Sequence, residues 1–379
     1  MREKVFACFE ATFGYQGRLY AAPGRINLIG EHTDYNMGWV LPGAIDKQFY
    51  VAIAANGSRE CRVCTAQDGH IEKFDMQSDC PPEAHWLRYI YGEARELMGE
   101  QARGFDLVVG SDIPVGAGIS SSAAFTSSLG LALNDVFELG YSRMQLAKAG
   151  QLCEHHYAGV SCGIMDPFAS LFGKKGYVMQ LDCRSLEYVY RPFAPQGLGL
   201  VLLDTRVKHS LAAGAYNERR RDCETGVACL QKVYPQIQSL RDVSLEQLDA
   251  EEGLLNPRIY RRCRYVIEEN ARVVAACAAL DRGDYAHLGS LMLASHEGLS
   301  KAYEVSCVEL DFLQELAAAW PGVLGSRMMG GGFGGCTLNL LQEDAVDGFV
   351  AAAHTAYEKK FWRTMGLIRV GIGEGASIV

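Results

Sequence analysis

The sequence predicts an α+β protein with two domains. Strand-like and helix-like segments are mixed without the regular alternation that a doubly wound sheet requires. The length of 379 residues corresponds to roughly two domains of typical size. An apolar fraction of 49% is sufficient for full hydrophobic cores. Turn-forming residues gather in segment 183–195, and we therefore expect domains 1–185 and 186–379, with the last strand free to return to the first domain.

Apolar runs bounded by turn residues predict four strands in the first domain, at residues 17–22, 49–55, 105–111 and 176–182. Two longer periodic runs predict helices. The first, at 83–98, follows Pro81 and Pro82, and the second, at 143–159, follows Ser142, which is a suitable N-cap residue.

The second domain is predicted to start with a strand at 198–205 and to be mostly helical beyond residue 215. Apolar positions recur three and four residues apart, as on one face of a helix, in segments 215–233, 256–280 and 344–361. A single strand-like run at 335–341 interrupts these helices, and another at 366–372 closes the chain.

Charge and composition exclude several classes of protein. A net charge of −9 and the lack of any Lys/Arg-rich run argue against a nucleic-acid-binding protein. The opening segment has no apolar h-region, and no apolar run approaches the length of a membrane span, so no secretory signal or membrane is expected. Thirteen scattered cysteines fit reduced thiols in a cytoplasm. We expect a cytoplasmic protein that is monomeric.

The segment GRINLIGEHTDY (24–35) interleaves apolar anchors with an unusual density of polar side chains. A core could not hold so many polar groups without partners. Loop capping by Glu31 and Asp34 is the structural alternative. Carboxylates and an imidazole on one rigid loop can instead donate to and accept from the hydroxyls of a small polar ligand. We favour a binding site.

The segment SDIPVGAGISSSAAF (111–125) places glycines and serines between a strand and a long apolar helix. A glycine turn and a helix start both present free backbone N–H groups to an anion, which favours a phosphate site over a plain capped turn. No Gly-Lys-Ser/Thr follows, so this is not a Walker A loop. Pro114 and Ser121 break the dinucleotide fingerprint, which argues against a nucleotide-dependent oxidoreductase.

Two further segments stand out. Five of the six residues at 330–335 are glycine, which indicates either a permissive turn or a close approach to a ligand or another loop. In CGIMDPF (162–168), Asp166 before Pro167 is typical of an N-cap with proline at the first helical position, and proline disfavours the α region for Asp166. A carboxylate fixed there can cap the helix or accept a proton.

These motifs, in order and spacing, resemble the three motifs of the GHMP small-molecule kinase superfamily, and the first resembles the sugar signature of its galactokinase family. The likeness continues through CGIMD, LDCRSL and VKHSLAAGAYNERRRDCE, so it covers most of the chain. The resemblance implies a two-domain α+β protein with its active site in the interdomain cleft. It also implies transfer of the γ-phosphoryl group of ATP to the anomeric hydroxyl of galactose, with ATP and Mg²⁺ as cofactors.

The resemblance also implies residue roles. Asp166 would be the catalytic base, with Arg25 beside it. The sugar would be bound by Glu31, His32, Thr33, Asp34, Gly163 and Tyr216. The nucleotide would be held by Val115, Gly116, Ala117, Gly118, Ile119, Ser120, Ser121, Trp86 and Tyr89, and magnesium by Ser121 and Glu154.

Two alternatives stay open from the sequence. One is a kinase of the same superfamily that acts on another sugar, such as N-acetylgalactosamine or arabinose. The other is a galactose- and ATP-binding sensor without catalysis, which the presence of Arg25, Glu154 and Asp166 argues against. Pro167 stands where members of the family usually carry Gln, which puts in doubt any substrate contact that such a glutamine makes.

Overall fold

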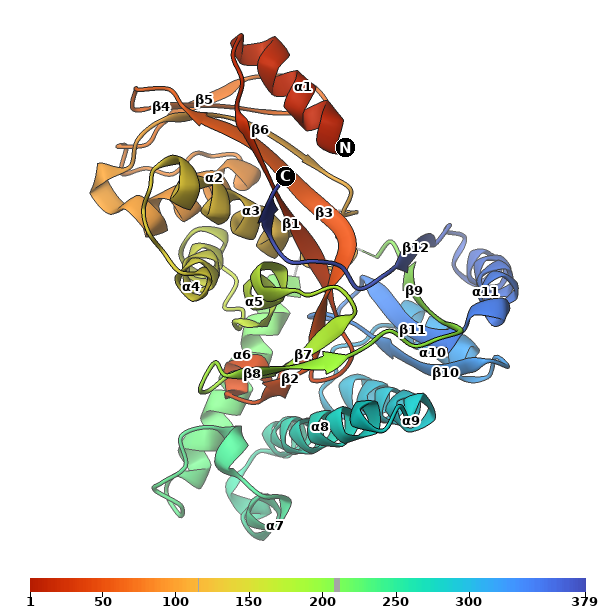
Figure 1. Ribbon diagram of the computed structural model, residues 1–379. Helices are drawn as coiled ribbons and strands as arrows, with labels where there is room; N and C mark the ends of the chain where they lie inside the picture. The colour runs from red at the N-terminus through yellow and green to blue at the C-terminus, as the bar shows by residue number, and fades with distance from the viewer. Residues whose placement is uncertain (115, 208–211) are drawn as a thin grey trace.

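The computed structural model describes residues 1–114, 116–207 and 212–379. Figure 1 shows two bodies side by side, one around β1 and β3 and one around β9 to β12, with α6, α7 and α8 below them. The mixture of helices and three separate sheets confirms the α+β prediction. In the described ranges 1–114, 116–207 and 212–379, none of the helices combines the length and apolarity needed to cross a bilayer.

The first body is a six-stranded sheet in the order β13-β1-β3-β6-β4-β5. Its strands are β1 (Arg18–Asn27), β3 (Pro42–Ala55), β4 (Glu60–Thr65), β5 (Glu72–Asp75), β6 (Phe105–Ser111) and β13 (Ser377–Ile378). Alternate residues of β3 face opposite sides, as the pleat requires. Ala52 packs under α1 (Arg2–Phe13), while Val51 and Ile53 pack in the core beneath the helices on the other face.

Four helices cover that second face: α2 (His85–Met98), α3 (Ser121–Val136), α4 (Arg143–Cys153) and α5 (Met165–Phe172). The prediction for α4 is confirmed, because Ser142 forms a full capping box with Gln145. The prediction that Asp166 is the N-cap of a helix, held outside the α region by Pro167, is wrong. Helix α5 starts at Met165 with Ile164 as its N-cap, so Asp166 is helical, and Pro167 is tolerated because it lies in the first turn.

The second body is a four-stranded sheet in the order β10-β11-β9-β12. Its strands are β9 (Leu198–Asp204), β10 (Val323–Met328), β11 (Cys336–Gln342) and β12 (Gly366–Val370). Helices α8 (Pro257–Asp281) and α9 (Tyr285–Glu297) share a core with one face, and α10 (Val308–Ala318) and α11 (Val346–Phe361) share a core with the other. Strand β10 was not predicted, and β11 is therefore not the single strand of its region.

A small sheet, β2-β7-β8, joins the two bodies. It consists of β2 (Trp39–Val40), β7 (Tyr177–Asp182) and β8 (Tyr188–Pro192). The predicted boundary near residue 185 falls in the turn between β7 and β8, which pair with each other. The division into domains 1–185 and 186–379 stays a prediction. Strand β13 pairs with β1 in the first sheet.

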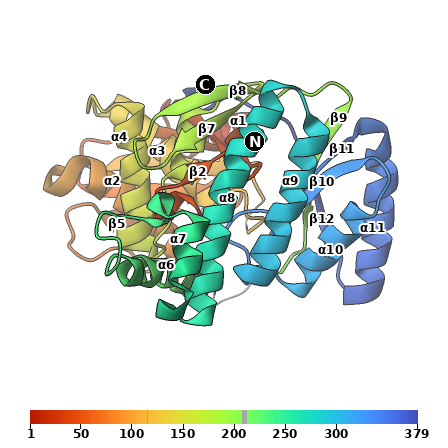
Figure 2. The ribbon, with the colours of Figure 1, turned by 90° about the horizontal axis from the view of Figure 1, so that it is seen from below.

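The remaining elements are helical. Helices α6 (Ala212–Leu230) and α7 (Leu245–Ala250) extend below the bodies. Short 3-10 helices lie at Asp34–Asn36, Gly99–Gln101, Leu240–Asp242, Glu252–Leu254 and Glu343–Ala345, and π-helical turns at Glu154–Ala158 and Gly298–Ala302. Seen from below in Figure 2, α8 runs between the helices of the first body and those of the second, so it can support a site between them.

Two helical glycines give a test of how tightly α9 supports β10. A Cβ on Gly289 in α9 would lie 2.0 Å from the carbonyl oxygen of Leu324 in β10, whereas a Cβ on Gly348 in α11 would lie 3.7 Å from its nearest neighbour, Trp320. We expect Gly289→Ala to lower the free energy of unfolding by about 1–3 kcal/mol through overpacking. Gly348→Ala should raise it by up to about 1 kcal/mol through helix propensity. Urea unfolding of both variants measures the difference, and equal effects would contradict this packing.

Candidate functional site

A cavity of about 200 Å³ lies where the three sequence motifs meet. Eight of the predicted catalytic, substrate and metal residues line it: Arg25, Glu31, His32, Asp34, Glu154, Gly163, Asp166 and Tyr216. The rest of its wall was not predicted and comes from Ser122, Ala123, Thr126, Gly150, Val160, Cys162, Met165, Pro167, Gly330 and Gly331. A larger hollow of about 630 Å³ between segment 193–199 and β12 contains no motif residue among those described, so size alone does not identify the site.

A bidentate ion pair between Arg25 and Asp166 forms one wall of the cavity. Arg25 Nε lies 2.7 Å from Asp166 Oδ1, and Arg25 Nη2 lies 2.9 Å from Asp166 Oδ2. The Arg25 side chain is only 4% exposed, while that of Asp166 is 28% exposed toward the cavity. The guanidinium therefore fixes the direction of a carboxylate that a ligand can still reach.

The glycine-serine turn before α3 contacts both members of the Arg25–Asp166 ion pair. Arg25 Nη1 donates to the carbonyl of Gly118 at 2.7 Å, and the backbone N–H of Arg25 donates to the carbonyl of Ile119 at 3.1 Å. The hydroxyl of Ser120 donates to Asp166 instead of capping α3. The first N–H groups of α3 thus have no side-chain cap, and a helix start of this kind can bind phosphate. Val115, the first residue predicted for nucleotide binding, lies outside the described residues.

The glycine run 330–335 packs against this turn. A Cβ on Gly330 would lie 3.0 Å from the carbonyl oxygen of Gly118, and the φ of Gly330 is 79°, in the left-handed region. Gly335 likewise faces the carbonyl of Ala117. The glycines are needed because two backbone segments approach each other closely, which is one of the alternatives that the sequence left open.

Glu31 lies in a buried electrostatic network. Its Oε1 accepts a hydrogen bond of 2.8 Å from the N–H of Gly330 and lies 3.2 Å from Nη2 of Arg327. Arg327 is completely buried and also donates to the carbonyl of Asn27 at 2.7 Å. Glu31 is therefore held in place by charge and by a hydrogen bond from the glycine loop.

Helix α8 supports the backbone of the loop that carries the polar motif, residues 30–39. The hydroxyl of Tyr265 donates to the carbonyl of Glu31 at 3.0 Å. The buried carboxylate of Glu269 accepts from the N–H of Gly30 at 2.8 Å. Both contacts come from the central turns of a long helix, so the loop is anchored to a rigid element.

His32 is surrounded by aromatic side chains. Its Nδ1 lies 2.7 Å from the hydroxyl of Tyr35, and its ring lies 5.3 Å from that of Tyr216 between centroids. Burial lowers the pKa of His32 to about 3, with the charges of Arg219 and Arg327 adding to the effect. The imidazole is consequently neutral at physiological pH.

Asp34 faces the cavity from the turn after His32. Its Oδ1 accepts from the N–H of Tyr35 at 2.9 Å, and a Cβ on Gly163 would collide with its Oδ2, so only glycine fits opposite it. Burial and the neighbouring charge of Asp166 raise the pKa of Asp34 to about 7. Thr33 does not line the cavity. It is buried, and its hydroxyl lies 2.8 Å and 2.6 Å from the carbonyl oxygens of Gly30 and Trp39.

Glu154 provides a fourth carboxylate to the lining of the cavity. Burial raises its pKa, while hydrogen bonds with Ser122 and Tyr89 oppose the shift. Tyr89 donates to Oε2 at 3.3 Å. Ser122, the neighbour of the predicted Ser121, is the serine that contacts this carboxylate. Trp86 and Tyr89 pack against the core from α2, and their predicted nucleotide role stays a prediction.

Sequence reasoning missed several residues that build the site. Arg327, Tyr265 and Tyr303 contact residues of the loop 30–39 from the second body, and Ser122 contacts Glu154. Only Arg327 left a signal in the sequence, since it is a charged residue that lies three positions before the glycine run and next to the apolar Met328 and Met329. The other partners are distant in sequence and carry no local pattern.

Comparison with known families gives three matches along the chain. The galactokinase galactose-binding signature matches residues 7–55, the N-terminal GHMP kinase domain matches 88–174, and the C-terminal GHMP kinase domain matches 276–359. Each match contains one of the three motifs identified in the sequence, at 24–35, 111–125 and 330–335. The predicted superfamily resemblance is confirmed.

Individual galactokinases are similar to this chain over nearly its whole length. Galactokinases from Chloroflexus aggregans and Chloroflexus aurantiacus are each 41% identical over 99% of this chain and 97% of their own length. The structure of Lactococcus lactis galactokinase complexed with galactose superimposes with a TM-score of 0.94 at 33% identity, over 100% of this chain and 99% of that one. A Methanococcus jannaschii mevalonate kinase, 16% identical over 95% of this chain and 99% of its own, shares the fold with a TM-score of 0.67.

The raised pKa of Asp34 predicts how stability depends on pH. Because the pKa rises from 3.8 to about 7 on folding, the folded protein binds this proton more tightly, and stability is lost as pH increases through that range. Asp34→Asn cannot ionise, so its stability relative to wild type should increase between about pH 5 and about pH 8. Urea unfolding at both pH values measures this difference. An equal effect of Asp34→Asn on stability at the two pH values would contradict the raised pKa of Asp34.

Proposed function

The chain belongs to the galactokinase family of GHMP kinases, and on that premise we propose how its residues transfer the γ-phosphoryl group of ATP to the anomeric hydroxyl of galactose. The family membership makes the protein an ATP-dependent sugar kinase. The observation that carries the assignment of residues is the Arg25–Asp166 pair, which faces the polar loop on one side and the start of α3 on the other.

The sugar would occupy the 200 Å³ cavity. Glu31 and Asp34 present carboxylate oxygens that accept from sugar hydroxyls, and His32 presents Nε2, which has no hydrogen-bond partner among the described residues. Tyr216 would form an apolar wall for the sugar ring, and Gly163 leaves the space that Asp34 needs. Thr33 would support the loop from behind rather than contact the sugar, because its hydroxyl is used by backbone carbonyls.

ATP would bind with its phosphates over the turn 116–121 and the start of α3. The uncapped N–H groups of the first turn and the dipole of a helix of 16 residues both favour an anion. Trp86 and Tyr89 on α2 are the proposed neighbours of the base. This placement directs the γ-phosphate toward Asp166, which the hydroxyl of Ser120 connects to the same turn.

The residues around Glu154 fit Mg²⁺. This ion prefers a few carboxylate and hydroxyl oxygens and keeps water and phosphate as its other ligands. Glu154 with Ser121 or Ser122 supplies such a set, and the buried carboxylate would gain from a neighbouring cation, since burial alone raises its pKa. When bound, the ion would neutralise charge on the phosphates.

Asp166 would accept the proton of the attacking hydroxyl. Its two oxygens have about four lone-pair positions, of which Arg25 occupies two and Ser120 occupies one. One position therefore remains for the sugar hydroxyl. Phosphoryl transfer has a loose transition state that needs little early proton transfer. The main contribution of Arg25 is accordingly to orient the carboxylate and to stabilise charge on the transferring group.

The remaining expectations are also proposals. All thirteen cysteines are free thiols and lie in the described part of the chain, which supports a reducing cytoplasm as the place of action. A net charge of −9 supports the expectation that nucleic acid is no partner. We also propose that the protein acts as a monomer.

Replacing Asp166 tests the catalytic assignment. We expect Asp166→Asn to lower kcat by about 10²–10⁴-fold, because the amide cannot accept the proton. Galactose affinity should change only a few-fold, since the amide oxygen still accepts from Arg25. Galactose-dependent ADP release measures kcat, and calorimetry with galactose measures affinity. A variant with nearly normal kcat would remove Asp166 from the reaction. Galactose binding by the wild type without any ADP release would instead indicate a sensor.

Replacing Glu154 tests the magnesium site. Glu154→Gln removes the only charged oxygen of the proposed set and should raise the Mg²⁺ concentration for half-maximal ATP binding by about tenfold or more. Galactose affinity should not change. Titration calorimetry of ATP at several Mg²⁺ concentrations gives both values. Comparison of Ser121→Ala with Ser122→Ala identifies the hydroxyl ligand, and an unchanged Mg²⁺ requirement in all three variants would refute the site.

A further inference from the structure

A chain of polar groups leads from the cavity into the second body of the protein. His32 Nδ1 lies 2.7 Å from the hydroxyl of Tyr35, which lies 2.8 Å from the hydroxyl of Tyr303. That hydroxyl in turn lies 3.2 Å from Sγ of Cys223 on α6. Tyr303 and Cys223 are buried, so no water competes for these contacts. The reaction described above uses only the imidazole end of the chain.

The imidazole has one proton to place. Because burial and two neighbouring arginines keep His32 neutral, either Nδ1 or Nε2 carries hydrogen, but not both. Nδ1 is engaged by Tyr35, whereas Nε2 has no hydrogen-bond partner among the described residues. A contact of the ring with the backbone of Gly331 opposes the lowering of its pKa. The tautomer thus decides whether His32 donates to a ligand or accepts from it.

Counting protons along the chain distinguishes the two tautomers. In one order, the thiol of Cys223 donates to Tyr303, Tyr303 donates to Tyr35, and Tyr35 donates to Nδ1, which leaves the imidazole proton on Nε2. In the reverse order, Nδ1–H donates to Tyr35, and the thiol proton at the far end needs another acceptor. In the first order, the thiol and both tyrosine hydroxyls each donate to the next group in the series.

The thiol end of these contacts favours the first order. Sγ of Cys223 lies 3.2 Å from the hydroxyl of Tyr303, and the thiol is buried. In the first order the thiol proton lies in this contact. In the reverse order Tyr303 donates to the sulfur, and the buried thiol proton is left out of the hydrogen-bond chain.

We propose that Tyr35, Tyr303 and Cys223 are positioning residues that hold His32 as the Nε2–H tautomer, so that His32 donates a hydrogen bond to an oxygen of the sugar. This inference rests on the proposed function and adds the direction of the hydrogen bond between His32 and the sugar. Glu31 and Asp34 accept when ionised, whereas His32 donates. The loop would therefore recognise one sugar oxygen as an acceptor and others as donors, which restricts the configuration of the ring that can bind.

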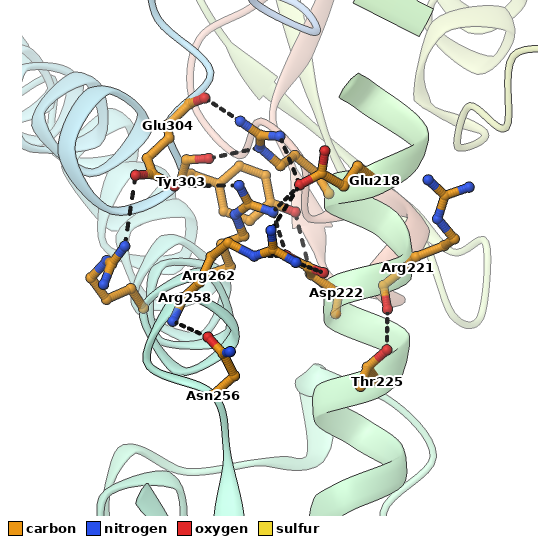
Figure 3. A network of polar contacts seen from close by, with 12 residues as sticks. Glu218, Arg221, Asp222, Thr225, Asn256, Arg258, Arg262, Tyr303 and Glu304 are labelled. Carbon is orange, nitrogen blue, oxygen red and sulfur yellow. Dashed lines mark hydrogen bonds and ion pairs between the residues drawn. The ribbon is translucent and has the colours of Figure 1, made fainter. Parts of the chain in front are cut away.

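The end of the hydrogen-bond chain at Tyr303 and Cys223 is held rigidly. Figure 3 shows the network of ion pairs in which Arg262 of α8 contacts Asp222, the neighbour of Cys223, and Glu304, the neighbour of Tyr303. Arg262 Nη2 lies 3.3 Å from Glu304 Oε2, and the guanidinium is almost completely buried. The network fixes α6 and the segment after α9 relative to each other, so the thiol and the hydroxyl stay in contact.

Nitrogen NMR of the unliganded protein tests the tautomer directly. With ¹⁵N-labelled histidine, the signal of His32 is assigned among nine histidines by its loss in His32→Gln. We expect a protonated Nε2 and an unprotonated Nδ1 in the wild type, and a mixture of tautomers in Tyr35→Phe. A proton on Nδ1 in the wild type would overturn the proposal. The readout requires neither galactose nor turnover, so it remains decisive if the proposed reaction fails.

Steady-state kinetics test the consequence. We expect Tyr35→Phe to raise the KM for galactose about tenfold and Tyr303→Phe about threefold, because a buried hydrogen bond is lost next to the imidazole or one link away. The KM for ATP should not change. Cys223→Ser keeps a donor and should behave as wild type, whereas Cys223→Ala should resemble Tyr303→Phe.

The control for these variants is Tyr141→Phe, which removes a tyrosine hydroxyl that donates to the carbonyl of Leu97 far from the cavity. It should leave both KM values unchanged. If Tyr35→Phe and Tyr303→Phe keep the wild-type tautomer and the wild-type KM for galactose, the chain does not position His32. If Cys223→Ser and Cys223→Ala have the same effect, the thiol is not a donor.

Discussion

The buried guanidinium of Arg25 is the constraint on which the active site depends. A cation that is taken out of water needs compensation by charge and by hydrogen-bond acceptors. Asp166 on α5 and the carbonyl of Gly118 before α3 supply it, and Ser120 joins the same carboxylate. Compensating one charge thus brings β1, α5 and the turn before α3 to one point. The second body adds Arg327, which neutralises Glu31 in the same way from the opposite side.

The fold could be predicted where burial is uniform along an element. Strands β6 and β9 are mostly apolar and mostly buried, and their predicted bounds agree with the structure to within a residue. Strand β10 escaped prediction because Ser326 and Arg327 interrupt its apolar run. Both side chains are buried, but their partners, Asn339 and Glu31, lie on other elements. Helix α1 escaped because it buries only Val5 and Phe9, too few residues for a clear period.

Many residues that line the site could be predicted, but the contacts among them could not. Glu31, His32 and Asp34 of the loop do converge with Asp166 and Tyr216 on one cavity. The sequence could not show that Thr33 uses its hydroxyl within the loop, or that Ser120 turns to Asp166 instead of capping α3. These side chains are short and have several possible partners. The choice among them depends on how the folded chain places other segments, since Ser120 and Asp166 are 46 residues apart. Local propensity carries no information about that choice.

Strand β13 connects the order of synthesis to the completion of the first sheet. Its residues Ser377 and Ile378 pair with β1, which leaves the ribosome among the first segments of the chain. Until β13 arrives, the outer edge of β1 has unpaired backbone groups, which other chains could recognise. A nascent chain therefore exposes this edge while the whole second body is translated. Tags or truncations at this end should accordingly affect solubility during expression more than turnover of the finished enzyme.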